Sequence, residues 1–368
     1  MRIYRVGGSV RDEFLGHQQQ DRDYVVLHAD EAAFVHRFPQ AKRVGRDSPV
    51  FILDGDEYTL SAAPDIASDL DGRDLTVNAV AREVQTGEVY SHPLAFGDMQ
   101  ARRLRPVAAA NFLGDPLRVY RAARFAAAWP AWCVTPELST AMRAAAAAQV
   151  LGRPAAERIG GEVRRALVSA APSRFLGLLY HTGCLGPWFF EWCGAAEIPA
   201  GPPAYHSGSV LAHTSRVLDA VAGTEIPAWM GWCHDLGKTQ TPPAKWPHHY
   251  HHEHCGAELA HVQGHRLRLP QRLILAGSLA ARWHMLAKRY QLLRPGTKLD
   301  LLLRVHHADV VESLSALAAA DGTPGVHTRM RADLKRVLAV RLPPEKRNRG
   351  QASGEYLRQL QIQALRGG

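Results

Sequence analysis

Two aspartates near the N-terminus have a spacing that suits chemistry on phosphate. Asp21 and Asp23 belong to residues 21–27, whose β-branched and aromatic content predicts a strand. Because side chains two apart on a strand face the same way, the two carboxylates are expected to project together. Paired carboxylate oxygens are good ligands for Mg²⁺. The pair therefore indicates a site for phosphoryl or nucleotidyl transfer assisted by metal ions.

A glycine turn just before this strand supplies groups that hold phosphates. Residues 3–6 read as a short strand, Gly7 and Gly8 permit a tight turn, and residues 10–15 have the apolar spacing of a short helix. The free N–H groups at a helix start favour an anion, and Arg11 adds a guanidinium. Taken alone, the two glycines could form a plain turn, and the two aspartates could be a solvated surface pair. Their combination in a strand–turn–helix–strand context favours a phosphate site with Mg²⁺.

Two further motifs carry side chains that suit a nucleotide. Residues 73–79 read Arg-Asp-Leu-Thr-Val-Asn-Ala and are expected to enter a helix at the threonine. Residues 114–118 read Gly-Asp-Pro-Leu-Arg and open a predicted helix in which Arg118, Arg121 and Arg124 recur. Arginines three apart cluster on one helix face. That face is either a surface for a nucleotide or a solvated basic face.

A second group of candidate ligands lies in the C-terminal half. A histidine and an aspartate are adjacent in Trp-Cys-His-Asp-Leu-Gly-Lys, residues 232–238, and such a pair can reach one divalent ion while distant histidines complete its shell. The candidate ligands are His213, His234, Asp235, His252, His284 and Asp321. The choice of His252 is open because five histidines crowd residues 248–254. A polar loop or adventitious metal binding is the alternative for that crowd.

Composition limits the class of protein. The 368 residues, 46% of them hydrophobic, allow two or three domains with substantial cores, and a net charge of +9 suits a polyanionic partner. No apolar run of about 18 residues predicts a membrane span, and we expect no membrane partner. The N-terminus enters a strand at once, unlike a signal peptide. Five scattered cysteines without a C-x-x-C pair favour the cytoplasm.

The elements that position these groups form an α+β region followed by helices. Residues 30–38 are expected to form a helix with Asp30 as N-cap, and residues 50–53 and 57–60 are expected to form a hairpin through Asp-Gly-Asp. We predict four parts: an α+β head at residues 1–107, a helical neck and body at 108–200, a helical domain around the second cluster at 201–322, and a basic helical tail at 323–368.

The order and spacing of the three N-terminal motifs resemble those of bacterial class II tRNA nucleotidyltransferases, the CCA-adding enzymes and their poly(A) polymerase relatives. This resemblance implies an α+β fold with a small mixed-sheet head. Residues 213–321 resemble an HD domain, a helical metal-dependent phosphohydrolase fold that some bacterial CCA-adding enzymes carry at this place. A divalent transition metal is expected at the HD site.

The resemblance implies that the 3′-hydroxyl of a tRNA, or of another structured RNA, attacks the α-phosphate of CTP or ATP. Asp21 and Asp23 would be catalytic and hold two Mg²⁺ ions. Asp115 and Arg118 would face the incoming base and imitate a Watson–Crick edge. The residues expected to bind the nucleotide are Gly8, Arg11, Arg73, Asp74, Asn78, Asp115, Arg118, Arg121 and Arg124.

The chain departs from the family pattern at several places. Gly72 stands where the family has an arginine, Gly114 where it has a glutamate, and His92 where it has an aspartate before proline. Residues 61–69 are too few for the flexible loop, containing arginine and glycine, that relatives use when addition changes from C to A. We therefore predict CC addition, or another restricted addition, rather than synthesis of the full CCA end.

Other interpretations stay open. The HD site could do the main work, as a phosphatase or a 2′,3′-cyclic phosphodiesterase, with the head serving as an RNA-binding module. The eroded motifs also allow a non-catalytic RNA-binding relative. A poly(A) polymerase is a variant of the first hypothesis, with A as the nucleotide added.

Overall fold

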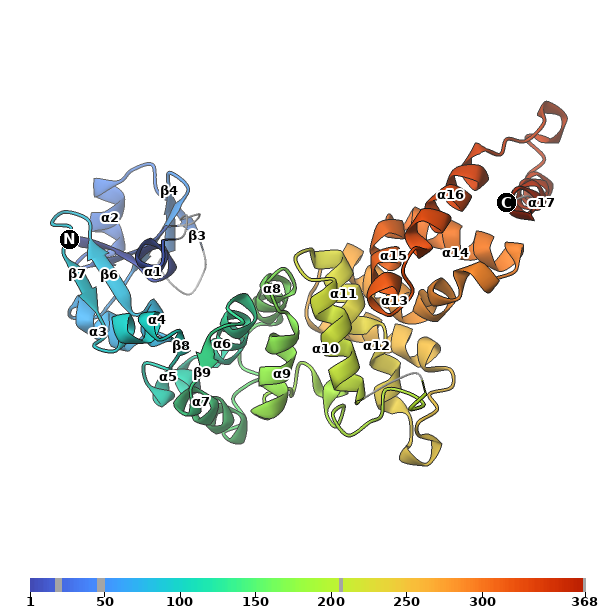
Figure 1. Cartoon of the computed structure of the whole chain (residues 1–368). Helices are drawn as coiled ribbons and strands as arrows, with labels where there is room; N and C mark the ends of the chain where they lie inside the picture. Colours follow the sequence, from blue (N-terminus) through green and yellow to red (C-terminus); the bar gives the residue numbers. More distant parts are fainter. Residues whose placement is uncertain (17–21, 45–49, 205–207, 367–368) are drawn as a thin grey trace. The chain divides into compact units, whose positions relative to one another are not determined.

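The computed structural model describes residues 1–16, 22–44, 50–204 and 208–366. The chain divides into two compact units. The first contains Met1–Pro154 with His181–Cys184, and the second contains Ala155–Tyr180 with Leu185–Gly368. All the strands of the described residues belong to the first unit, and the second is helical (Figure 1). The predicted α+β class is confirmed, and the finer four-part division stays a prediction.

One mixed sheet of seven strands forms the head of the first unit, in the order β3-β4-β5-β2-β1-β6-β7. The strands are β1 (Arg2–Val6), β2 (Asp23–Leu27), β3 (Lys42–Val44), β4 (Val50–Leu53), β5 (Asp56–Leu60), β6 (Val80–Glu83) and β7 (Val89–Ser91). Strand β2 is antiparallel to β1 and parallel to β5. The strand that carries Asp23 is therefore central in the sheet.

Apolar side chains that alternate along the strands form a buried cluster on each face of the sheet. In β2, Val25 and Leu27 join one cluster, which includes residues of α3 (Ile66–Asp71). Val26 faces the opposite way and packs with Phe34 of α2 (Glu31–Arg37). This alternation is what a strand covered on both sides requires. Asp23 shares the side of Val25, because it precedes that residue by two positions.

Local signals placed several elements correctly. The carboxylate of Asp30 accepts a hydrogen bond from the backbone N–H of Ala33 at 2.8 Å, so the predicted N-cap is confirmed. The hairpin between β4 and β5 is confirmed too, with Asp54 and Gly55 both at positive φ, as a tight two-residue turn requires. A helix begins at Thr76 as predicted, but it is a single 3-10 turn, η1 (Thr76–Asn78), because the chain soon enters β6, which pairs with β1.

Helices complete the first unit. The turn at Gly7 opens α1 (Gly8–Phe14). The remaining elements are α4 (Ala95–Gln100), β8 (Arg103–Leu104), α5 (Ala109–Gly114), α6 (Leu117–Ala128), β9 (Cys133–Val134) and α7 (Pro136–Ala147). The helix predicted for the arginine motif is confirmed as α6, whose apolar residues are buried.

The second unit is built from α8 (Ala156–Leu167), α9 (Ser173–His181), α10 (Val210–Ala220), α11 (Glu225–Cys233), α12 (His252–Arg266), α13 (Gln271–Lys288), α14 (Pro295–His307), α15 (Val311–Ala320), α16 (Val326–Ala339) and α17 (Gln351–Arg366), with short 3-10 turns between them. Apolar residues of α11, α13, α14, α15 and α16 share one core. In the part of the chain that the structure describes, no helix is both long enough and apolar enough to cross a membrane.

Candidate functional site

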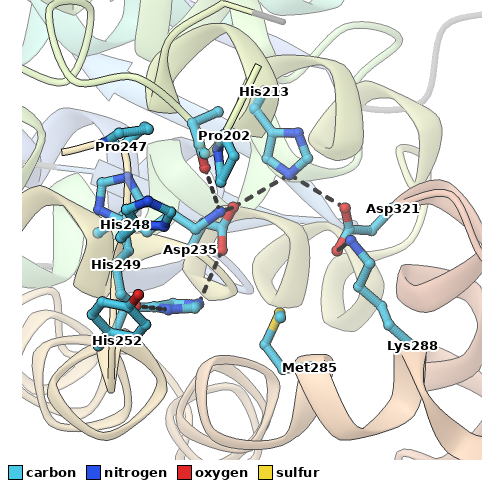
Figure 2. Close-up of a pocket in the computed structure, with 14 residues that line it drawn as sticks. Pro202, His213, Asp235, Pro247, His248, His249, His252, Met285, Lys288 and Asp321 are labelled. Atoms are coloured by element: carbon cyan, nitrogen blue, oxygen red, sulfur yellow. Dashed lines mark hydrogen bonds and ion pairs between the residues drawn. The ribbon is translucent and has the colours of Figure 1, made fainter. Parts of the chain in front are cut away.

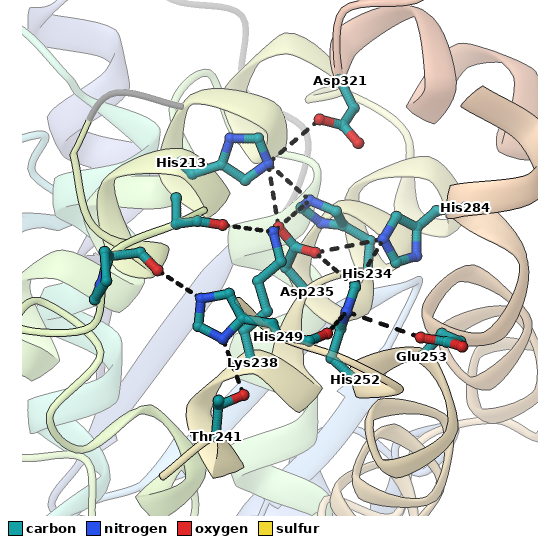
Figure 3. Close-up of polar contacts among 12 residues, drawn as sticks. His213, His234, Asp235, Lys238, Thr241, His249, His252, Glu253, His284 and Asp321 are labelled. Carbon is teal, nitrogen blue, oxygen red and sulfur yellow. Dashed lines mark hydrogen bonds and ion pairs between the residues drawn. The ribbon is translucent and has the colours of Figure 1, made fainter. Parts of the chain in front are cut away.

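Four imidazoles surround one buried carboxylate in the second unit (Figure 3). Oδ1 of Asp235 lies 3.5 Å from Nε2 of His252 and 3.4 Å from Nε2 of His284. Its Oδ2 lies 3.3 Å from Nε2 of His213 and 3.4 Å from Nε2 of His234. The result is two three-residue ligand groups that share the aspartate.

Four helices and one turn bring these residues together. His213 lies on α10, His234 and Asp235 follow α11, His252 begins α12, and His284 lies on α13. The turn after the His-Asp pair, η3 (Leu236–Gln240), packs directly on the start of α12. A Cβ atom on Gly237 would lie 2.7 Å from the backbone nitrogen of Gly256, so only glycine permits this approach. The glycine of the His-Asp-Leu-Gly motif thus sets how closely α12 approaches the aspartate.

Backbone contacts fix how the histidine rings present their nitrogens. Nδ1 of His234, His252 and His284 each lies between 2.7 and 3.1 Å from a carbonyl oxygen of its own helix or turn. A carbonyl can only accept, so Nδ1 carries the proton and Nε2 presents its lone pair. His213 differs, since the guanidinium of Arg216 donates to its Nδ1 at 2.9 Å. Its Nε2 therefore carries the proton in this arrangement.

Three atoms that can only accept hydrogen bonds therefore lie close together: Nε2 of His252, Nε2 of His284 and Oδ1 of Asp235. Nε2 of His252 and Nε2 of His284 are 3.4 Å apart, and both are about as near to Oδ1 of Asp235. Among the described residues, none donates a hydrogen bond to this buried Oδ1. A buried acceptor without a donor is unfavourable, and a cation would satisfy all three atoms. The mixture of imidazole nitrogen and carboxylate oxygen fits a divalent transition metal.

The electrostatics of the cluster suit metal binding. Burial would raise the pKa of Asp235, but the charge of Lys238 opposes this effect most strongly, and the pKa lies well below its usual value. Burial lowers the pKa of His284 despite the opposing effect of Asp235. At neutral pH the carboxylate is thus ionised and the His284 imidazole is neutral. These are the protonation states that a metal requires of Asp235 and His284. Burial would lower the pKa of His234, but Asp235 and Asp321 outweigh this effect, so that pKa is instead raised.

A pocket of about 170 Å³ opens beside the cluster, and two lysines line it (Figure 2). Nζ of Lys238 lies 2.7 Å from Oδ2 of Asp235 and donates to the carbonyl of Ala200 at 2.8 Å. Nζ of Lys288 lies 3.0 Å from Oδ2 of Asp321. Oδ1 of Asp321 also lies 3.3 Å from Nε2 of His213. The candidate metal site and two lysines that suit a phosphate therefore line the same pocket.

The crowded histidine stretch contributes His252 alone to the buried cluster of the described residues. The ring of His249 is held elsewhere, because Nδ1 contacts the Thr241 hydroxyl at 2.9 Å and Nε2 contacts the carbonyl of Pro199 at 2.7 Å. All six predicted ligands of the second cluster are buried and lie together. No local signal in the sequence favours His252 over the four histidines near it, but its position at the start of α12 brings it to Asp235.

The head site is built on the central strand. Asp21 lies outside the described residues, and Asp23 is an exposed residue at the start of β2. Glu57 is its partner in the parallel pairing of β2 with β5. The pKa of Glu57 is raised, first by desolvation and then by the charge of Asp23. A cation between the two carboxylates would relieve this repulsion, which fits the predicted Mg²⁺.

A buried network joins four of the residues predicted to bind the nucleotide. Oδ1 of Asp74 accepts hydrogen bonds from the N–H of Leu75 at 2.8 Å and from Nδ2 of Asn78 at 3.0 Å. Its Oδ2 accepts from Nε of Arg121 at 2.7 Å. Burial would raise the pKa of Asp74, but Arg121 and Asn78 hold it well below its usual value. The Arg11 guanidinium donates to Oδ1 of the same asparagine.

Arg11 is itself buried and held on three sides. Its Nε donates to Oδ1 of Asp12 at 2.8 Å, and its guanidinium lies over the ring of Trp129, 4.5 Å from the centroid. A Cβ atom on Gly8 would contact this guanidinium at 3.4 Å. The glycine turn and the arginine are thus adjacent, as the motif predicted.

The other predicted nucleotide residues lie on or beside α6. Arg118 donates to the carbonyl of Arg73 at 3.3 Å, and its Nε is 3.9 Å from Oδ2 of Asp115. Arg73 forms an ion pair with Asp69 at 2.7 Å. The guanidinium of Arg124 lies over the adjacent Phe125 ring. The two residues expected to face the base are therefore near each other, with Arg118 anchored on the second motif.

Four residues that lie in these two sites were not among the predicted site residues. Lys238 stood inside the quoted His-Asp-Leu-Gly-Lys motif, and Lys288 follows a predicted ligand by one helical turn, so each had a signal. Glu57 had none until the parallel pairing of β5 with β2 was known. Trp129 likewise became relevant only when α6 brought it to Arg11.

Comparisons with known proteins cover almost the whole chain. No protein-family model matches it. The "Multifunctional CCA protein" of Xanthomonas oryzae pv. oryzae is 34% identical, over 99% of this chain and 98% of that protein. The "Multifunctional CCA protein" of Nitrosococcus oceani is also 34% identical, over 100% of this chain and 98% of that protein.

Solved structures share the fold at low identity. The Thermotoga maritima CCA-adding enzyme complexed with tRNA has a TM-score of 0.68 at 17% identity, over 100% of this chain and 88% of that one. The Bacillus stearothermophilus CCA-adding enzyme in complex with CTP has a TM-score of 0.64 at 20% identity, over 99% of this chain and 89% of that one. A CCA-adding enzyme with ATP has a TM-score of 0.65 at 16% identity, over 100% and 88% of the two chains.

The ligands of these solved enzymes, tRNA, CTP and ATP, are the partners that the sequence predicted. The predicted enzyme class, tRNA nucleotidyltransferase, is confirmed by the full-length relatives. With about one residue in three identical from end to end, and with a buried His/Asp cluster of HD type, the chain belongs to the family of bacterial multifunctional CCA proteins, the class II CCA-adding enzymes.

Proposed function

We propose that this chain adds C and A from CTP and ATP to the 3′ end of tRNA. The observation that carries the proposal is the buried network around Asp74, which ties Asn78, Arg11 and Arg121 together in the unit that bears Asp23. The family membership identifies the RNA substrate as tRNA. The net charge of +9 suits such a polyanion.

In the proposed reaction the 3′-oxygen of the tRNA forms a bond to the α-phosphorus, and the bond to the β-phosphate breaks to release pyrophosphate. The proton of the hydroxyl passes to solvent. Asp21, Asp23 and Glu57 would hold Mg²⁺, which lowers the pKa of the attacking hydroxyl and neutralises the leaving group when bound. Arg11 and Arg73 would provide positive charge for the triphosphate.

The base would be selected by protein side chains rather than by a nucleic-acid template. Asp115 supplies carboxylate acceptors and Arg118 supplies guanidinium donors, which together match the edge of a base. Arg118 is anchored on the carbonyl of Arg73, so the residues for the base and for the phosphates are mechanically linked.

The predicted restriction to CC addition is not supported by the comparisons, because the full-length relatives are named as CCA proteins. We therefore propose complete CCA addition. The connection between β5 and α3 is short, and the hydroxyl of Ser61 is bonded to Asp69 at 2.9 Å. Residues outside this connection would have to support the change from C to A.

A direct assay uses tRNA transcripts that end at the discriminator base, at C and at CC. Each is incubated with Mg²⁺ and one labelled nucleotide at a time, and Asp23→Ala is assayed in parallel. We expect C on the first two transcripts, A on the third, and no incorporation by the variant. Incorporation that stops after two C residues would instead establish a CC-adding enzyme.

We further propose that the buried cluster of the second unit is a phosphohydrolase site. The convergence of three acceptor atoms from Asp235, His252 and His284 supports a divalent ion there. A metal-bound water would supply the nucleophile for a phosphate ester when the ion is bound. Lys238 and Lys288 would neutralise the phosphate.

The matching assay follows metal-dependent hydrolysis of 2′-phosphate and 2′,3′-cyclic phosphate esters. His284→Ala should abolish hydrolysis and leave nucleotide incorporation intact, whereas Asp23→Ala should do the reverse. His307→Ala, which removes an exposed histidine of α14, is the control. Hydrolysis without incorporation in the wild type would favour the alternative in which the head only binds RNA. We place the protein in the cytoplasm, where tRNA is processed.

A further inference from the structure

An exposed pair of flat rings lines the pocket beside the metal cluster. Tyr250 is 74% exposed, and its ring is stacked on that of His248, with centroids 5.6 Å apart and an angle of 12° between the planes. Both residues line the pocket. An aromatic ring left this open gains little from the protein core, whereas a flat ligand could cover it.

Other residues that line the same pocket are charged. Asp235 and Asp321 of the cluster line it, together with Lys238 and Lys288 (Figure 2). Both lysines line the pocket, and each is paired with one of these carboxylates. The pocket therefore combines a part suited to a phosphate with a part suited to a ring.

The size of the pocket indicates how a ligand would divide between these parts. Its volume of about 170 Å³ is below the roughly 300 Å³ at the lower end for sites that enclose a whole small ligand. A phosphate and part of a sugar would fill the enclosed space. A base attached to that sugar would lie towards solvent, where an exposed ring such as Tyr250 is available.

We propose that Tyr250, backed by His248, is a stacking platform for the base of a nucleotide whose phosphate lies at the Asp235 cluster. This inference rests on the proposed phosphohydrolase function of the same site. It adds to that function a preference for phosphate esters that carry a base, either a free nucleotide or the 3′ end of an RNA. A small phosphate ester without a ring would contact the charged residues of the pocket but not Tyr250.

The test compares adenosine 2′-monophosphate, a short RNA that ends in a 2′,3′-cyclic phosphate, and glycerol 2-phosphate, with the metal-loaded full chain. Tyr250→Ala should raise KM about tenfold for the substrates with a base and leave kcat unchanged, because stacking contributes to binding rather than to bond cleavage. Tyr250→Phe keeps the ring and should behave as the wild type. Glycerol 2-phosphate should respond to neither change. If Tyr250→Ala raises KM for the RNA alone, the platform binds the base at an RNA end. If it raises KM for both substrates, the platform also binds a free nucleotide.

An equal change in KM for all three substrates, or no change for any of them, would overturn the platform. Absence of hydrolysis of every substrate by the wild type would refute the phosphohydrolase function instead. In that case calorimetric binding of adenosine 2′-monophosphate to the metal-loaded protein still tests the platform. About tenfold weaker binding by Tyr250→Ala than by Tyr250→Phe supports it, and equal binding overturns it.

Discussion

Substitution of Gly237 by alanine should damage the metal cluster without touching any of its ligands. The turn η3 packs on the first residues of α12, and an added Cβ would lie 2.7 Å from the nitrogen and 2.9 Å from the Cα of Gly256. The carbonyl oxygen of His252 would be closer still. Ordinary contacts of this kind are 3.4 Å or longer. All three neighbours are backbone atoms, so a rotamer change cannot relieve the overlap.

The start of α12 would therefore have to move away from η3 by about 1 Å. Overpacking of this kind typically destabilises by about 1–3 kcal/mol. The same movement would separate His252 from Asp235, whose atoms are now 3.5 Å apart. Misplacement of a catalytic group by about 1 Å can lower a rate about 100-fold. We expect Gly237→Ala to bind less metal and to hydrolyse phosphate esters at about one hundredth of the wild-type rate.

The assay measures metal content after dialysis, hydrolysis, and urea unfolding for Gly237→Ala and for a matched control. Gly161→Ala is suitable, because this glycine lies within α8 and has no atom within 4 Å of the added Cβ. The control should keep its metal and gain up to about 1 kcal/mol of stability from the higher helix propensity of alanine. Wild-type metal content and hydrolysis in Gly237→Ala would refute the reasoning.

Three further predictions concern the head. Asp74→Asn should destabilise the first unit by about 2 kcal/mol at pH 7, measured by hydrogen exchange, because it removes a buried charge paired with the partly exposed Arg121; unchanged exchange would contradict this. Because the folded-state pKa of Asp74 is lowered, its ionised carboxylate stabilises the wild type fully above about pH 4, and this stabilisation is lost as the pH falls further. The free energy of unfolding should therefore fall less steeply with decreasing pH in Asp74→Asn than in the wild type. Trp129→Ala should raise KM for CTP about threefold to tenfold by releasing the guanidinium of Arg11, and Trp129→Tyr should restore it; an equal KM in both variants would contradict that role.

Local patterns predicted the features that neighbouring residues decide. Asp30 caps its helix, and Asp54 with Gly55 turns its hairpin, because each depends on a few consecutive backbone groups. The short length of the helix that begins at Thr76 has the opposite origin. Residues after it pair with β1, which lies far away in the sequence, and this pairing prevails over local helix propensity.

The sequence by itself determined which chemistry the chain carries. The residue types in the glycine turn, the two nucleotide motifs and the His-Asp pair are set by what phosphates and metals require, and that information is local. Only the tertiary structure decided which side chains meet. Glu57 joins Asp23 through a parallel strand pairing, and Trp129 meets Arg11 when α6 packs on the turn. His252 rather than His249 reaches Asp235 because Gly237 allows α12 to approach. Such contacts depend on the packing of distant segments, which no spacing along the chain encodes.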